Sequence, residues 1–286
     1  MSCECGLVGR LTARRRVLRL GGPEPVERPD TLVVEEPLEI RVGGRALVVT
    51  MRTPGDDMDL AAGFLVSEGV ISEAGHLRAI RYCAGALEDG ENTYNLLDVD
   101  LDDAVPPPDP SLERSFYTTS SCGLCGKASL DAVRTSARWS VAEDPVQVTA
   151  ELLSSLPKRL RDAQRVFDKT GGLHAAGLFS DAGDLLCLRE DVGRHNAVDK
   201  VVGWAVREGR LPLRGSVLLV SGRASFELTQ KAWMAGIPVL AAVSAPSSLA
   251  VDLAVEAGIT LVGFLRGPTM NVYAGSQRVG VRQTTP

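Results

Sequence analysis

The chain has 286 residues, of which 44% are hydrophobic, enough to bury a full core in one large domain or two smaller ones. Its formal net charge of −5 excludes the broad positive field that gathers nucleic acid, so any bound polyanion is expected to be small. The longest apolar stretches are broken well short of a membrane span and no secretion signal is recognisable. We therefore expect a cytoplasmic protein that binds neither nucleic acid nor membranes.

The N-terminal part of the sequence favours β-structure after a flexible lead-in, since the first residues are rich in Arg, Gly and Pro without periodicity. In residues 38–51, two alternating apolar runs flank Gly43-Gly44, which predicts a β-hairpin. A turn then leads into a predicted helix that ends near Gly69, and residues 79–101 are expected to form further strands. The predicted organisation is a flexible tail (1–30), a β-rich portion (31–103), a Pro-rich linker (104–117), an α/β domain (118–275) and a second tail (276–286).

The second half of the sequence alternates short apolar strands with helical patterns. An amphipathic helix over 148–167, interrupted by Pro157, precedes this region. The alternation predicts an α/β layered sheet that is largely parallel in this half. The expected strands are 174–179 and 185–188, which form a hairpin across Ser180–Gly183, followed by 217–220, 238–243 and 259–265. The expected helices lie around 198–205, 226–235 and 249–257.

The most informative segment carries two thiols, Cys122 and Cys125, in a Gly- and Ser-rich run. Small neighbours leave the sulfur atoms accessible, and Lys127 adds a nearby positive charge. Structural zinc needs two further ligands at compatible spacing, and a zinc deaminase needs an upstream His-x-Glu or Cys-x-Glu, so zinc is disfavoured and no permanently bound metal is expected. The residues alone leave disulfide exchange and persulfide transfer open.

The other four cysteines carry no comparable pattern. Six cysteines are sparse for a disulfide framework in a chain of this length, so reduced thiols are expected. The isolated Cys83 and Cys187 are expected to be small core hydrophobes. The sequence assigns no role to Cys3 and Cys5.

Three further segments place charge or glycine where anions bind. Arg194 and His195 fall in the first turn of a predicted helix, where backbone N–H groups favour anions. The loop Ser221–Ser225 lies between a strand and a helix, the arrangement that holds phosphates in open α/β sheets. The turn Gly263–Asn271 also follows a strand and carries Arg266. Two such loops in one sheet indicate a large, phosphate-bearing ligand.

Taken together, these stretches resemble the formate dehydrogenase accessory sulfurtransferases, the FdhD/NarQ family. The resemblance covers about residues 31–273, and its most specific strings are Cys122-Gly-Leu-Cys-Gly126 and Asp191-Val-Gly-Arg-His-Asn196. The other matching stretches are Glu35–Ile40, Arg52–Asp57, Gly63–Leu65, Ser67–Gly69, Gly172–Ala176, Ser221–Arg223 and Gly236–Val239. Cys3 and Cys5 fall outside this pattern.

The resemblance implies a cytidine-deaminase-like three-layer α/β/α sheet with an additional β-rich N-terminal portion, in a homodimer. It implies a sulfurtransferase that accepts a persulfide from a cysteine desulfurase. The sulfur would pass to the molybdenum or tungsten of the bis-molybdopterin guanine dinucleotide cofactor, which the client formate dehydrogenase needs in sulfurated form. The alternative is a non-catalytic chaperone that binds and delivers this cofactor, which predicts that activation survives the loss of both thiols.

The same resemblance implies roles for particular residues. Cys122 would carry the persulfide, and Cys125 would assist or relay it. The family's cofactor-binding segment maps to Phe264, Leu265, Arg266, Gly267, Pro268, Thr269 and Met270, and its guanine-nucleotide affinity suits Ser221, Gly222 and Arg223. Lys127, Arg194 and His195 are candidates for anion or proton handling, and no metal ligand is assigned.

Overall fold

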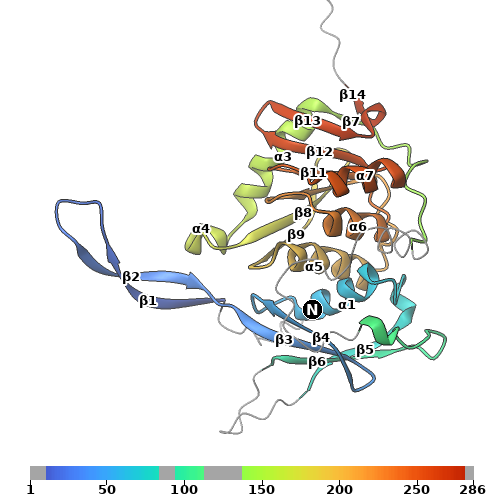
Figure 1. The fold of residues 1–286 in the computed structure, drawn as a ribbon, viewed down its shortest axis with the longest axis horizontal. Coiled ribbons are helices and arrows are strands. Elements are labelled where there is room, and N and C mark those ends of the chain that lie inside the picture. The colour runs from blue at the N-terminus through green and yellow to red at the C-terminus, as the bar shows by residue number, and fades with distance from the viewer. Residues whose placement is uncertain (1–10, 84–93, 113–136, 281–286) are drawn as a thin grey trace, which may run out of the picture.

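The computed structural model describes residues 11–83, 94–112 and 137–280. Its largest element is a six-stranded sheet in the order β13-β12-β11-β10-β8-β9 (Figure 1). The central strands are almost continuous apolar runs because both faces of the sheet are covered. The six strands are β8 (His174–Ser180), β9 (Leu185–Asp191), β10 (Ser216–Val220), β11 (Val239–Ala242), β12 (Thr260–Arg266) and β13 (Thr269–Ala274).

Helices cover both faces of this sheet. One face packs into a common core with α5 (Arg194–Arg207), α6 (Phe226–Met234) and α7 (Ser248–Ala257). The opposite face packs against α3 (Ala150–Ala163), which buries Leu153, Leu156 and Leu160 and is followed by the short helix α4 (Phe167–Thr170). The predicted α/β fold with helices on both faces is confirmed.

The predicted largely parallel arrangement is wrong, because only the β10–β11 and β11–β12 pairings of this sheet are parallel. Strands β8 and β9 form the predicted hairpin, which is confirmed. Strands β12 and β13 are also joined by a short turn, and a short connection forces antiparallel pairing. Helix α5 then carries the chain from β9 to β10 across β8, which leaves β8 antiparallel to both neighbours. The apolar pattern of a strand does not encode its direction.

Helix α3 also differs from its prediction. The chain stays helical through Pro157 instead of breaking there. The buried leucines on both sides of the proline hold the two halves of the helix on the same sheet face, which outweighs the local cost of the missing N–H.

The N-terminal portion forms a second sheet of four strands in the order β4-β3-β6-β5. Its strands are β3 (Glu36–Val42), β4 (Arg45–Arg52), β5 (Leu77–Tyr82) and β6 (Leu96–Leu101), which confirms the predicted hairpin and the further strands. Helix α1 (Asp57–Ser67), also as predicted, lies between this sheet and α5. The helices α1 and α5 cross at two facing glycines: a Cβ atom at Gly63 would lie 1.8 Å from the carbonyl oxygen of Asp199.

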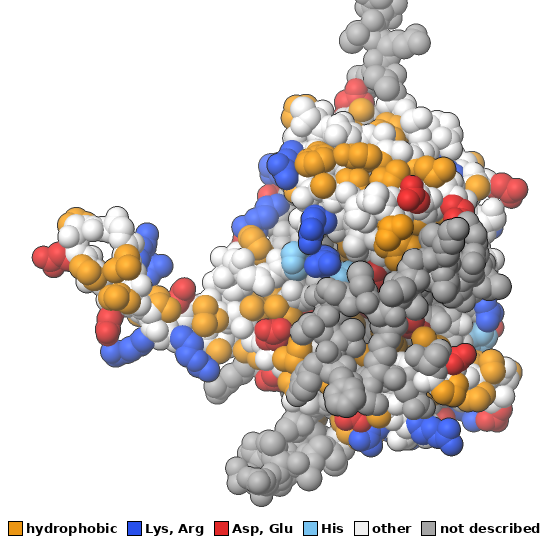
Figure 2. Space-filling model, in the orientation of Figure 1, with side chains coloured by type: hydrophobic (Ala, Val, Ile, Leu, Met, Phe, Trp, Pro, Cys, Tyr) orange, Lys and Arg blue, Asp and Glu red, His pale blue; other side chains and the backbone are white. Residues whose placement is uncertain are grey.

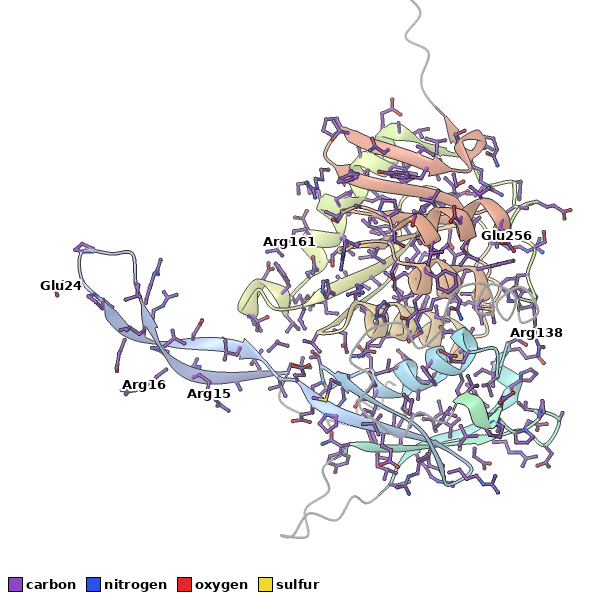
Figure 3. All side chains as sticks on the ribbon, in the orientation of Figure 1. Arg15, Arg16, Glu24, Arg138, Arg161 and Glu256 are labelled. Atoms are coloured by element: carbon purple, nitrogen blue, oxygen red, sulfur yellow. The ribbon has the colours of Figure 1, made fainter. Side chains whose placement is uncertain are left out.

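A two-stranded ribbon projects from the body, formed by β1 (Thr12–Arg19) and β2 (Val26–Val33) (Figure 1). Its side chains are mostly exposed, with apolar and basic side chains interleaved along it (Figure 2), and Arg15 and Arg16 point away from the ribbon (Figure 3). The predicted flexible tail is therefore wrong for residues 12–30. The prediction failed because a ribbon exposed on both faces lacks the apolar alternation that marks a half-buried strand.

The C-terminal boundary is corrected in the same way. Residues 276–280, predicted as part of a tail, form the 3-10 turn η3 (Ser276–Arg278) and the strand β14 (Val279–Gly280), which pairs with β7 (Val148–Thr149). Arg278 is buried there and donates to the carbonyl oxygens of Val141 and Ala142 at 2.6 and 2.8 Å. The remaining short elements are the 3-10 turns η1 (Ala74–His76) and η2 (Pro110–Leu112). No helix in the described residues is long and apolar enough to cross a membrane.

Candidate functional site

Three loops meet where the parallel strands β10, β11 and β12 end, and we call this region the site edge. The amide of Ser244, after β11, donates to the carbonyl oxygen of Gly222, after β10, at 3.2 Å. The amide of Phe264, near the end of β12, donates to the carbonyl oxygen of Ser244 at 3.1 Å. The structure thus brings the predicted loop at 221–223 and the predicted segment at 264–270 to one edge, where open α/β sheets bind their ligands.

Two basic groups from neighbouring elements lie beside Gly222. A Cβ atom at this position would lie 3.5 Å from Nδ1 of His174, at the start of β8, and 3.9 Å from Cδ of Arg194, in the first turn of α5. Burial and the positive charge of Arg194 lower the pKa of His174, so its imidazole is uncharged at neutral pH. Within the described residues, Nε of Arg194 is buried and has no hydrogen-bond partner. Because an unpaired buried donor is costly, this nitrogen marks a position where an anion would be stabilised.

His195 has a different environment from its neighbour. Its Nε2 lies 3.3 Å from Oγ of Ser225 and 3.4 Å from a carboxylate oxygen of Glu227, so the side chain links the N-terminal turns of α5 and α6. Burial is the main cause that lowers the pKa of His195 to about 4. The residue is therefore a neutral link between two helices, while Arg194 remains available to a ligand.

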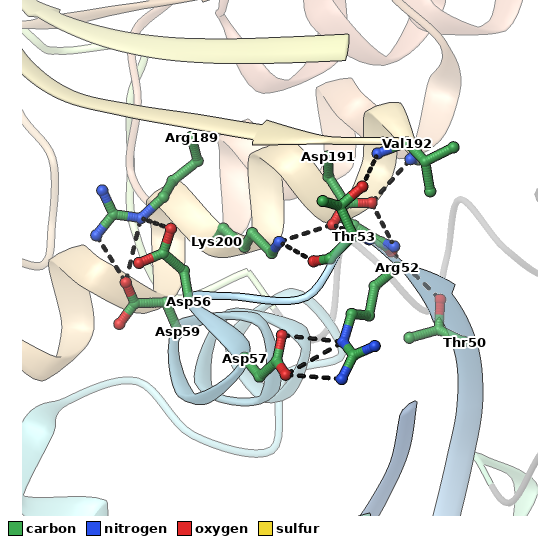
Figure 4. A network of polar contacts seen from close by, with 12 residues as sticks. Thr50, Arg52, Thr53, Asp56, Asp57, Asp59, Arg189, Asp191, Val192 and Lys200 are labelled. Carbon is green, nitrogen blue, oxygen red and sulfur yellow. Dashed lines mark hydrogen bonds and ion pairs between the residues drawn. The ribbon is translucent and has the colours of Figure 1, made fainter. Parts of the chain in front are cut away.

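Asp191 and Asn196, at the two ends of the Asp191–Asn196 motif, anchor it to the N-terminal portion, and Figure 4 shows Asp191 beside Thr53 and Lys200. The carboxylate of Asp191 is fully buried, lies 2.7 Å from Nζ of Lys200 and accepts from the amide of Thr53 at 3.2 Å. The Nδ2 group of Asn196 donates to the carboxylate of Asp191 at 3.0 Å and to the carbonyl oxygen of Met51 at 2.7 Å. These contacts fix the start of α5 and hence the position of Arg194.

The predicted segment 264–270 divides into exposed and buried side chains. Phe264 is 39% exposed and has a left-handed backbone with φ of 52°, which is uncommon for a residue with a side chain. The guanidinium of Arg266 lies 5.8 Å from the centre of its ring, and Nε of Arg266 donates to the carbonyl oxygen of Val243 at 3.1 Å. The exposed ring and guanidinium together offer a platform for a planar, negatively charged ligand.

The other members of this segment are placed as follows. Gly267 takes a positive φ of 57° and forms the turn between β12 and β13 with the exposed Pro268, and the exposed Thr269 begins β13. Leu265 is fully buried in the core and Met270 packs against the same core. The side chains of Leu265 and Met270 thus pack in or against the core, and a role of these two positions in ligand binding stays a prediction. Ser221 also has a structural bond, since its Oγ accepts from the amide of Ala175 at 2.9 Å, whereas Arg223 is exposed.

The two thiols of the Cys-x-x-Cys pair and Lys127 lie outside the described residues, so the roles of Cys122, Cys125 and Lys127 stay predictions. Cys187 is buried as predicted, and its burial raises the pKa of the thiol to about 12. Cys83 is half-buried.

His174 is a site residue that was not assigned from the sequence. It belongs to the Gly172–Ala176 stretch that carried the family resemblance, but no chemistry was attached to it there. Its place at the site edge follows from the antiparallel pairing of β8 with β10, which puts the first residue of β8 beside the last residues of β10. The sequence pattern favoured parallel strands, which would have placed that residue at the opposite edge.

Comparisons with known proteins agree with this geometry. The model of the FdhD/NarQ family matches residues 33–280. The chain is 68% identical over 276 residues to a protein named "Sulfur carrier protein FdhD" from Streptomyces avermitilis, which covers 96% of this chain and 98% of the relative. It is 58% identical over 275 residues to the protein of the same name from Mycobacterium tuberculosis, covering 95% and 100%.

A solved structure also shares the fold. A formate dehydrogenase accessory protein from Desulfotalea psychrophila superposes with a TM-score of 0.74 at 25% identity, covering 94% of this chain and 100% of that chain. The family match and the curated relatives extend over most of the described fold, including the site edge. The chain therefore belongs to the FdhD/NarQ family.

Proposed function

We propose that this protein is a cytoplasmic sulfur carrier that takes sulfur on Cys122 and passes it to the bis-molybdopterin guanine dinucleotide cofactor destined for formate dehydrogenase. The relatives named as sulfur carriers support the general role. The observation that carries the ligand assignment is the buried, unpaired Nε of Arg194 beside Gly222. A phosphate of the guanine dinucleotide would satisfy this donor and match its charge.

The two thiols would share the transfer chemistry. The thiolate of Cys122 attacks the terminal sulfur of the persulfide on a cysteine desulfurase, whose cysteine leaves as a thiolate. The thiolate of Cys125 then attacks Sγ of the Cys122 persulfide, which forms a disulfide and releases hydrosulfide as the ligand for the metal. Both electrons of the released sulfide come from the two thiols, so a cellular thiol reductant must reduce the disulfide before the next cycle.

Residues of the site edge would hold the acceptor during this step. Phe264 and Arg266 offer an aromatic face and a cation for the guanine base and its phosphates. Arg194 and the exposed Arg223 contribute positive charge at the loop that follows β10. The uncharged His174 can donate or accept a hydrogen bond next to them.

The thiol role is tested by the intact mass of the protein after incubation with a cysteine desulfurase and cysteine. Wild type and Cys83→Ala, a control at a thiol without an assigned role, should gain sulfur that a reducing agent removes. Cys122→Ala should gain none, and Cys125→Ala should load sulfur but release it slowly. Sulfur gain in Cys122→Ala equal to wild type would refute the assignment.

The ligand role is tested separately with GDP as the probe. Arg194→Gln should bind GDP at least about tenfold more weakly in calorimetry, because it loses a charge-assisted hydrogen bond. Arg138→Gln, on a different surface, serves as the matched control. Equal GDP affinity in Arg194→Gln and wild type would refute the proposal that a phosphate binds at Arg194.

A non-catalytic cofactor chaperone is the second candidate, because the described part of the site edge already combines cationic and aromatic groups that suit a guanine dinucleotide. The Cys122→Ala/Cys125→Ala protein decides between the two. Under both proposals it should bind GDP as wild type does. Only the chaperone predicts that this variant still activates formate dehydrogenase.

A further inference from the structure

Two basic side chains, His174 and Arg194, lie beside Gly222 in the loop that follows β10. A Cβ atom at Gly222 would lie 3.5 Å from Nδ1 of His174 and 3.9 Å from Cδ of Arg194, which are ordinary van der Waals distances. His174 begins β8 and Arg194 begins α5, so two separate elements bring their basic groups to one point of the site edge. Both groups are therefore within reach of a single diphosphate bound at this loop.

The imidazole of His174 is uncharged in the unliganded protein and is not engaged by its surroundings. Burial and the positive charge of Arg194 lower its pKa, and the negative charge of Asp191 opposes this only in part. Asp191 pairs with His174 across β8 and β9, but its carboxylate is held by Nζ of Lys200 at 2.7 Å and Nδ2 of Asn196 at 3.0 Å. Among the described residues, the imidazole of His174 has no hydrogen-bond partner. The half-buried side chain is therefore free to bind a ligand.

The other two histidines of the chain have structural contacts instead. His195 links the first turns of α5 and α6, and burial is the main cause that lowers its pKa to about 4. His76 lies in η1 of the N-terminal portion, where its Nδ1 accepts from the amide of Ser72 at 3.3 Å. His174 is thus the histidine that a ligand at the site edge can protonate by its charge.

A bound diphosphate would reverse the electrostatic balance at His174. A phosphate paired with the buried, unpaired Nε of Arg194 offsets the positive charge that disfavours a second cation, and adds an attraction of its own. The diphosphate inside a dinucleotide is esterified at both ends and carries one negative charge on each phosphate. Arg194 supplies one positive charge and a protonated His174 supplies the second. The exposed Arg223 in the same loop is screened by solvent and contributes less.

We propose that His174 is the second phosphate-binding group of the site edge, and that it takes up one proton from solution when the diphosphate binds. This inference rests on the proposed function, since it concerns the same ligand. Because the ligand and the proton bind together, the affinity rises as the pH falls from 8 to 6, and the proton leaves again when the diphosphate is released.

Calorimetry with GDP-mannose tests the proposal. Both phosphates of this probe are esterified and do not titrate in this range, whereas a terminal phosphate has a pKa of about 6. Titrations at pH 6.5 in two buffers of different ionisation enthalpy count the protons. Wild type should take up at least about half a proton per bound ligand and bind about tenfold more tightly at pH 6 than at pH 8. His174→Gln should take up none, with an affinity that changes less than about twofold. His76→Gln is the matched control and should behave as wild type.

Nuclear magnetic resonance gives a second readout on the wild-type protein, since three histidines yield few imidazole C–H signals. The signal missing from His174→Gln identifies His174. Saturation with GDP-mannose should move its titration midpoint to higher pH by at least about one pH unit, and should leave that of His76 unchanged.

The outcomes separate this inference from the proposed function. Binding of GDP-mannose without proton uptake and with an unchanged midpoint for His174 would overturn the inference but leave the phosphate site at Arg194 intact. Binding of GDP but not of GDP-mannose would overturn it as well, because the diphosphate of the dinucleotide is esterified in the same way. Binding of neither probe would refute the phosphate site itself, and the inference with it.

Discussion

Replacing Gly203 by alanine should destabilise the protein, although a glycine-to-alanine change inside a helix ordinarily stabilises it by about 1 kcal/mol. A Cβ atom at position 203 would lie 1.7 Å from the carbonyl oxygen of Asp59 and 2.8 Å from the amide nitrogen of Gly63. Both atoms belong to the backbone of α1 and cannot rotate away. Since carbon and oxygen need about 3.3 Å, the helices α1 and α5 must separate by about 1.5 Å.

This separation weakens two kinds of contact. Dispersion between the helices falls steeply, because a gap of about 1 Å already removes up to half of it. The bonds that tie Asp59 to Arg189, at 2.7 Å, and to Arg207 are displaced as well. We therefore expect a loss of about 3 kcal/mol in the free energy of unfolding, toward the upper end for overpacked cores.

Thermal unfolding followed by circular dichroism measures this effect. A loss of this size should lower the midpoint by about 5–10 °C. Gly75→Ala is the matched control, because no atom lies within 4 Å of a Cβ atom at that position, and it should unfold within about 1 °C of wild type. A Gly203→Ala protein as stable as wild type would show that the close crossing of α1 and α5 is not required.

Three further predictions concern the site edge and its support. Phe264→Asn keeps a residue that tolerates the left-handed backbone but removes the ring, so stability should change little while GDP affinity in calorimetry falls about tenfold. His195 stays unprotonated in the folded state down to about pH 4, whereas in the unfolded state it takes a proton below about 6.5. The stability that the uncharged His195 provides is therefore complete above pH 6.5 and lost as the pH falls to 4. Between these two pH values, the free energy of unfolding from urea titrations should fall by about 3 kcal/mol more in wild type than in His195→Gln. Lys200→Met leaves the carboxylate of Asp191 buried without its cation. The free energy of unfolding, measured with urea at pH 7, should fall by about 3–5 kcal/mol, and the additional change Asp191→Asn should partly restore it.

The helices and strands of the α/β half were predictable because each is marked by a short apolar run and ends at a glycine or a polar turn. Gly236 and Gly258, which end two helical patterns, both adopt the positive φ expected there. Apart from the hairpin of β8 and β9, strand direction was not predictable, because it depends on which strands become neighbours. That failure also concealed His174, whose position beside β10 follows from antiparallel pairing.

The buried polar pairs were not predictable either. Arg52 is 1% exposed and bonds to Asp57, and Lys231 is 2% exposed and bonds to Asp199 at 2.9 Å. In the sequence these residues are indistinguishable from surface charges, since arginine, lysine and aspartate are usually exposed. Their burial follows from the packing of α1 and the four-stranded sheet against α5 and α6, which no local pattern in the sequence marks.

In the motif Asp191-Val-Gly-Arg-His-Asn196, three polar side chains stabilise the protein and one is left for the proposed ligand. Asp191 and Asn196 bind the backbone at the end of β4 and just after it, and His195 joins the first turns of α5 and α6, so these three side chains are committed to the protein itself. Arg194 alone among its polar side chains has a buried nitrogen without a partner in the described residues. The cost of leaving that donor unpaired is tolerable because three neighbours fix the helix start on which it sits, and the same rigidity holds the guanidinium ready for an anion.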